Sequence, residues 1–248
     1  MRTLSCLVFL IACAAARGGT VPPGGLDDAL AARAMLGGDT WARLVRIDNT
    51  RPRSVLRRGP YPRTVYALVF ELSGILWFYT GVDGTQSLSL TTGTVARDEA
   101  DPGPLFRSID PGFTEWRWIE PPKGPTAPFS ARPRNACFVE SVAALNRRIA
   151  AGGEANSPRL LSYYVDTPGG RLGHTVLLFG TAGGLAAIDA DDSDRPEALP
   201  VELGTDPRAL SAYLRGGPVA AARTIPVVCA RTPPREWAAL PAAPAPAG

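Results

Sequence analysis

The chain has 248 residues, a formal net charge of +3, 45% hydrophobic residues and 20% charged residues. A chain of this length and composition can bury a core of its own, which excludes a largely disordered or fibrous protein. The charge is nearly balanced, and the arginines between Arg51 and Arg63 lie in a proline-rich stretch without a recognisable nucleic-acid-binding motif. Nucleic acid is therefore excluded as the expected partner.

The first residues have the pattern of an export signal. Arg2 precedes a short apolar run that is followed by small residues, and the run is too short to persist as a transmembrane helix. Residues 10–13, Leu-Ile-Ala-Cys, resemble the lipobox of bacterial lipoproteins. The resemblance implies a signal peptide over residues 1–12 and a lipid on Cys13 that holds the mature protein on a membrane surface of the cell envelope. Cleavage after Ala16, giving a soluble periplasmic or secreted protein, is the alternative.

Stretches rich in proline, glycine and alanine divide the rest of the chain. We expect a flexible linker over residues 13–25, a β-rich region over 26–120, a linker over 121–134, an α+β domain over 135–230 and a disordered tail over 231–248. The β-rich region offers few strands for a separate core. We therefore expect the two regions to pack as one unit.

The β-rich region begins with a predicted helix over residues 26–36, which ends at a glycine pair. A predicted strand over residues 41–47 carries arginines on both faces, which indicates an edge position. Three further strands, at residues 64–72, 75–82 and 85–90, are separated by Ser73-Gly74 and Asp83-Gly84 turns and form an antiparallel meander. Beyond them, Trp116 and Trp118 share one side of an extended segment. They either line an acyl-binding groove beside Cys137 or pack in the core, and packing is favoured.

An amphipathic helix follows the second linker. Apolar residues recur at helical spacing after Cys137, at Phe138, Val142, Leu145 and Ile149. Asn135 is the expected N-cap, which places Cys137 in the first turn. The unpaired N–H groups and the positive end of the helix dipole there favour a thiolate over a thiol. Cys137 is therefore the candidate nucleophile.

His174 is the one histidine of the chain, and it begins the apolar run of a predicted strand. A short turn at residues 181–184 leads to a second strand that ends in Asp189-Ala190-Asp191. With a loop of two or four residues, Asp191 lies opposite His174, and Asp189 shares that face because side chains alternate along a strand. The two carboxylates are alternative orienting acids for the imidazole. A helix capped by Asp206 and a final edge strand containing Pro226 complete the domain.

A cysteine at the start of a helix, a histidine on a strand and an acid on the next strand resemble the transglutaminase-like branch of the papain-like cysteine enzymes. The resemblance implies an α+β fold in which an antiparallel sheet carries the cysteine-bearing helix. It also implies a triad in which Cys137 is the nucleophile, His174 the base and Asp189 the orienting acid. The implied activity is that of a cysteine hydrolase or acyltransferase that acts on peptide or amide bonds of a peptide or protein substrate.

In this mechanism Cys137 attacks a carbonyl carbon, and its backbone N–H together with the Asn135 side chain stabilises the oxyanion. The sequence contains neither a phosphate-binding glycine loop nor cysteine and histidine residues at metal-ligand spacing. We therefore expect no cofactor and no metal.

Alternatives without catalysis stay open. In an exported protein Cys137 can be oxidised to Cys229, and a lone histidine is often structural. The chain is then an envelope-anchored lipoprotein that binds a partner or the wall through an inert scaffold.

Overall fold

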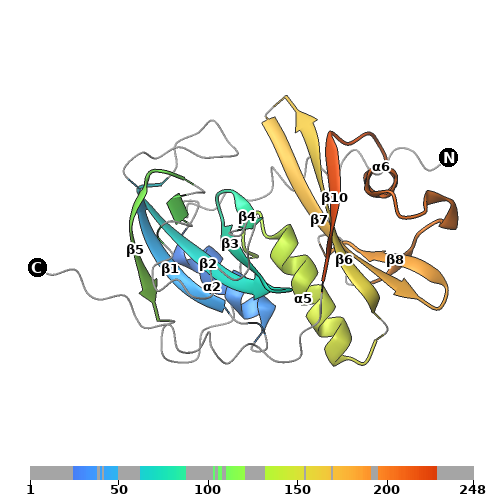
Figure 1. Ribbon diagram of the computed structural model, residues 1–248, viewed down its shortest axis with the longest axis horizontal. Coiled ribbons are helices and arrows are strands. Elements are labelled where there is room, and N and C mark those ends of the chain that lie inside the picture. The colour runs from blue at the N-terminus through green and yellow to red at the C-terminus, as the bar shows by residue number, and fades with distance from the viewer. Residues whose placement is uncertain are drawn as a thin grey trace, which may run out of the picture.

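The computed structural model describes residues 25–37, 40, 42–49, 62–87, 103, 106–107, 110–120, 132–153, 155–168, 170–190 and 195–227. The described part is a mixed α+β structure with two antiparallel sheets (Figure 1). The predicted signal peptide, Cys13, most of both predicted linkers and the tail lie outside the described residues.

Sheet A contains five strands in the order β4-β3-β2-β1-β5. Their bounds are β1 Ala42–Asn49, β2 Thr64–Leu72, β3 Ile75–Thr80, β4 Gly84–Ser87 and β5 Phe113–Ile119. The predicted meander is confirmed, because β2, β3 and β4 pair in antiparallel succession. Ser73 and Gly74 both have positive φ, 56° and 74°, as a tight two-residue hairpin turn requires.

The predicted edge position of the first strand is wrong. β1 lies inside sheet A, paired with β2 on one side and β5 on the other. Its arginines interact with side chains inside the sheet: the Arg43 guanidinium lies 4.3 Å from the centre of the Trp118 ring, and Arg46 pairs with Asp48 at 3.2 Å. Charge on both faces misled the prediction because long cationic side chains can cover aromatic rings of a neighbouring strand.

Sheet B also contains five strands, in the order β10-β6-β7-β8-β9. Their bounds are β6 Asn156–Thr167, β7 Gly170–Thr181, β8 Gly184–Ile188, β9 Glu197–Ala198 and β10 Ala221–Pro226. The predicted hairpin is confirmed, with Thr181 opposite Gly184 and a two-residue turn between them. β10 is an edge strand, which tolerates Pro226 because a proline has no N–H to donate to the ladder.

The helices are α2 Leu26–Leu36, α5 Cys137–Ala150 and α6 Pro207–Arg215, and a 3-10 turn, η1, covers Val201–Leu203. α6 begins as predicted, because the Asp206 carboxylate accepts from the backbone N–H groups of Arg208 and Ala209. α5 lies between the two sheets (Figure 1), and α6 covers the other face of sheet B.

One core joins the two sheets through α5. Phe138 is 5% exposed and its ring centre lies 4.5 Å from that of Trp77 on β3. Val142 and Leu145 of the same helix belong to a cluster that also contains Leu177 and residues of both sheets. Burying a phenylalanine side chain contributes about 2 kcal/mol, so this helix stabilises both halves of the molecule.

The outer edge of sheet A carries the tryptophan pair. Trp116 and Trp118 stand on β5, and their rings pack against Phe106 at centroid distances of 5.9 and 6.4 Å. They belong to the cluster on the face of sheet A that does not contain α5. This placement supports the packing role and not an acyl-binding groove beside Cys137.

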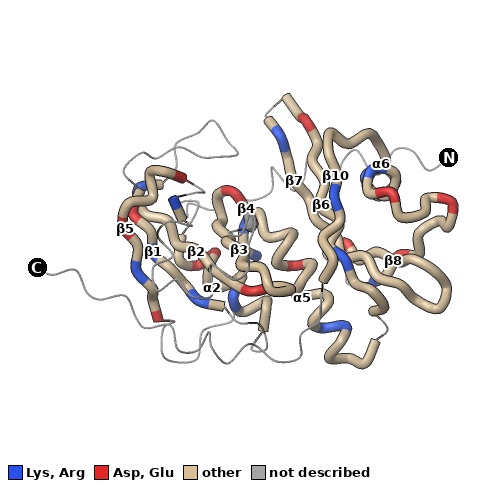
Figure 2. The backbone as a smooth tube through the Cα atoms, in the orientation of Figure 1, with Lys and Arg blue, Asp and Glu red and all other residues tan. Residues whose placement is uncertain are grey.

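Charges of both signs are interspersed over the described part of the chain (Figure 2). The lobe built on each sheet carries lysine or arginine next to aspartate or glutamate. Most of the arginine cluster between Arg51 and Arg63 lies outside the described residues.

Candidate functional site

A tight turn precedes α5, which begins at Cys137. The N-cap is Ala136 and not Asn135, and no side chain caps the helix. Asn135 instead adopts a left-handed conformation with φ of 51°, which asparagine tolerates better than most residues. The predicted N-cap was therefore one residue early, and Cys137 is the first helical residue.

Long-range hydrogen bonds to α2, to β3 and to the turn between β3 and β4 hold this turn in place. The Asn135 side-chain amide donates to the backbone oxygens of Gly81 and Val82, both at 2.9 Å. The Tyr79 hydroxyl donates to the Arg134 oxygen at 2.6 Å, and the Arg134 N–H donates to Asp28 at 3.2 Å. Both amide hydrogens of Asn135 are thus engaged by carbonyls. In the structure the Asn135 side chain anchors the turn, and its oxyanion role stays a prediction.

His174 lies on β7 and meets the acid that follows β8. Its Nε2 is 2.8 Å from Asp189 Oδ2, with the two side chains 20% and 37% exposed. The β7–β8 ladder ends where Leu177 faces Ile188, so Asp189 is the first residue beyond it. Continuing the register would set His174 opposite Asp191, but Asp191 lies outside the described residues.

A side-chain hydrogen bond to Cys137 is among the causes that raise the pKa of the His174 imidazole. Ser141, one turn further along α5, donates to the Thr175 backbone oxygen at 2.9 Å and so ties the helix to β7 beside His174. The structure therefore brings Cys137, His174 and Asp189 together. Cys137 is a free thiol, and Cys229 lies outside the described residues.

Tyr163 supports the imidazole from the neighbouring strand. It faces His174 across the β6–β7 ladder, and the two ring centres lie 5.4 Å apart in an edge-to-face arrangement. Burial raises the pKa of the Tyr163 hydroxyl, so this group stays neutral beside the charged pair. Sequence reasoning missed Tyr163 because nothing in the local pattern of β6 distinguishes it from other alternating residues.

The electrostatics of the site favour the imidazolium. Burial alone would lower the pKa of His174, but hydrogen bonds to Asp189 and Cys137 outweigh it and hold the pKa well above the ordinary 6.5. A protonated histidine in this position can stabilise a thiolate and can later supply a proton to a leaving group.

This shift predicts how stability depends on pH. Because the pKa of His174 is higher in the folded state, its contribution is fully present below the unfolded pKa of about 6.5 and is lost as pH rises through the folded value. We expect the free energy of unfolding of the wild type, relative to His174→Gln, to fall across that window in urea titrations. A difference that stays constant or grows with pH would contradict the assignment.

The first turn of α5 supplies backbone donors. With Ala136 as N-cap and no capping side chain, the first hydrogen bond of the helix runs from the Glu140 N–H to the Ala136 oxygen at 2.8 Å. The N–H groups of the residues before Glu140, including Cys137, have no acceptor within the helix. They are suited to an oxyanion that forms next to the sulfur.

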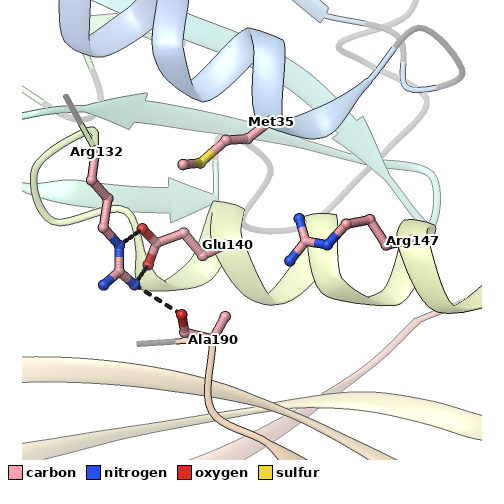
Figure 3. A pocket seen from close by; sticks show the side chains of 5 residues that line it. All are labelled: Met35, Arg132, Glu140, Arg147 and Ala190. Atoms are coloured by element: carbon pink, nitrogen blue, oxygen red, sulfur yellow. Dashed lines mark hydrogen bonds and ion pairs between the residues drawn. The ribbon is translucent and has the colours of Figure 1, made fainter. Parts of the chain in front are cut away.

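A cavity of about 190 Å³ lies beside Ala190, the residue that follows Asp189. It is lined by Met35, Arg132, Glu140, Arg147 and Ala190 (Figure 3). Arg132 and Glu140 were not identified from the sequence. Glu140 stands between two buried residues of α5, and a buried carboxylate needs a cationic partner.

The described residues contain no cluster of three or more histidine, cysteine, aspartate or glutamate side chains able to hold a metal ion. Within the same residues, no helix has both the length and the apolar character needed to cross a bilayer. Comparison with known proteins found no match to the chain among protein-family models, curated proteins or solved structures.

Proposed function

We propose that the chain is an exported cysteine hydrolase or acyltransferase that acts on peptide or amide bonds. The observation that carries this proposal is one contact chain, from Cys137 at the start of α5 through the His174 ring to the Asp189 carboxylate. The α5 helix on an antiparallel sheet supports a relation to the transglutaminase-like and papain-like enzymes. The signal-like N-terminus and Cys13 support export and anchoring to the envelope.

The first half of the reaction forms a thioester. With the thiol proton held on the His174 imidazolium, the Cys137 sulfur attacks the substrate carbonyl carbon while the carbonyl π electrons move to oxygen. The resulting oxyanion accepts from the Cys137 backbone N–H. When the carbonyl re-forms, the C–N bond breaks and the His174 imidazolium gives its proton to the leaving nitrogen. Asp189 keeps the ring orientation and stabilises its charge throughout.

The second half releases the acyl group. His174 removes a proton from a water molecule, whose oxygen attacks the thioester carbonyl, and the C–S bond breaks to give a carboxylic acid and restore the sulfur. An amine acceptor in place of water gives an amide by the same steps. Both outcomes share the acyl-enzyme, so the proposed function includes hydrolysis and acyl transfer.

Ester acylation tests the proposal on the full mature chain. With p-nitrophenyl acetate we expect a burst of nitrophenol, an acetyl group on Cys137 by mass spectrometry, and slow turnover. Cys137→Ala is expected to lose the burst, whereas Cys229→Ala keeps it and serves as the matched cysteine control. Added amine should yield acetylamide if the chain is an acyltransferase.

Acylation of Cys137 no faster than that of a small-molecule thiol would overturn the proposal. The same holds if Cys137 proves to be oxidised in the exported protein. Either result would favour the non-catalytic envelope protein.

A further inference from the structure

Arg132 links α5, which begins at Cys137, to the segment after β8 that contains Asp189. Its Nε and Nη2 donate to the two carboxylate oxygens of Glu140 on α5, and Nη2 also donates to the Ala190 backbone oxygen at 3.2 Å (Figure 3). The side chains of Arg132 and Glu140 are 25% and 6% exposed. The planar guanidinium can donate to the Glu140 carboxylate and to the Ala190 oxygen at the same time, which a lysine ammonium does less well.

The bonded carbonyl belongs to the residue next to Asp189. β8 ends at Ile188, so the ladder to β7 does not extend to Asp189 and Ala190. A charged donor on the Ala190 oxygen restrains the backbone directly beyond the ladder. Glu140 in turn lies on the first turns of α5, three residues after Cys137.

We infer that Arg132 is a positioning residue, which sets the Asp189 carboxylate against the His174 ring by clamping Ala190 to Glu140. The inference rests on the proposed function for its catalytic meaning, but the clamp itself acts on the His174–Asp189 pair. Its effect passes through the orientation of Asp189.

A direct electrostatic effect of Arg132 and a positioning effect predict opposite changes in the pKa of His174 when Arg132 is replaced. Removing a nearby positive charge raises the pKa of an imidazole, and an uncompensated Glu140 carboxylate would raise it further. Loosening Asp189 lowers the pKa of His174, because the hydrogen bond to Asp189 is a main cause of its elevation. Among the described residues, the titratable groups that act on His174 include Asp189 after β8, Cys137 on α5 and Tyr163 on β6.

The test is an NMR titration of the single imidazole in the untagged mature chain. We expect Arg132→Met to lower the pKa of His174 by about one unit, a tenfold change in proton affinity. Arg132→Lys should restore part of that loss. Arg147→Met, which removes the same charge from the same cavity, should not lower the pKa.

A double-mutant cycle separates positioning from general loosening. In an Asp189→Asn background, Arg132→Met should change the pKa of His174 no further, because the group through which it acts is already gone. If Arg132→Met does not fold, Arg132→Met with Glu140→Leu removes the unpaired buried carboxylate and still breaks the clamp.

A pKa that rises or stays constant in the folded Arg132 variants would overturn the inference, as would an equal fall in the Asp189→Asn background. The titration reads out the ring in the absence of turnover. Failure of ester acylation with a positive titration would therefore reject the proposed function and leave the clamp standing.

Discussion

Replacing His174 with alanine is expected to slow alkylation of Cys137 by iodoacetamide at pH 7 on the order of a hundredfold. The reason is that in the proposed mechanism His174 takes the thiol proton and balances the resulting charge. Asp189→Asn should have a smaller effect, about tenfold, because an amide keeps a hydrogen bond to the ring but cannot stabilise an imidazolium.

Intact-mass kinetics of carbamidomethylation in a Cys229→Ala background measure this effect directly. Tyr163→Phe is the matched control, because it keeps the aromatic edge next to His174 and should leave the rate close to that of the parent. Circular dichroism checks that each variant folds. Equal alkylation rates in the His174→Ala variant and its parent would show that the thiol is not activated.

Gly81→Ala is expected to destabilise the fold by about 2 kcal/mol, the usual scale for overpacking. A Cβ at this position would lie 2.6 Å from Asp28 Cγ and 3.0 Å from Asp28 Cβ. Asp28 cannot move aside freely, because its carboxylate accepts from the Arg134 N–H and pairs with the Arg134 guanidinium at 3.8 Å. The added methyl group therefore strains the turn that leads into Cys137.

Thermal or urea unfolding measures the loss. Gly183→Ala is the matched control, because a Cβ there meets nothing closer than Thr181 Oγ1 at 3.8 Å. Asp28→Ala should recover part of the loss in the Gly81→Ala background, since it removes the clash, although it costs the turn a hydrogen-bond acceptor on its own. Equal stability of Gly81→Ala and the wild type would mean that Asp28 is not held in place.

Local patterns in the sequence were enough to predict the hairpin and the helix that carry the candidate site residues. Turn residues and alternation predicted the hairpin that carries His174 and Asp189, and helical spacing predicted α5 within one residue of its start. These features depend on a few neighbouring residues, so a single sequence contains the information.

The supports of the site depend on partners far along the chain. Asn135 resembles an N-cap locally, but its amide is committed to Gly81 and Val82, more than 50 residues earlier, as the separations of 54 and 53 show. The Ala190 oxygen is bonded by Arg132 across 58 positions. Neither hydrogen bond produces a periodic pattern in the sequence, because the same side chain could bond to a carbonyl at many different backbone positions.

The turn before α5 has a consequence for dissecting the protein. The turn that leads into Cys137 is held by the Gly81 and Val82 carbonyls between β3 and β4, whereas His174 lies on β7 and Asp189 directly follows β8. A truncated piece spanning residues 132–227 would contain all three reactive side chains and would still lose the scaffold that aims one of them. The chemistry that we propose therefore depends on both sheets, and the N-terminal half is needed to position the candidate nucleophile.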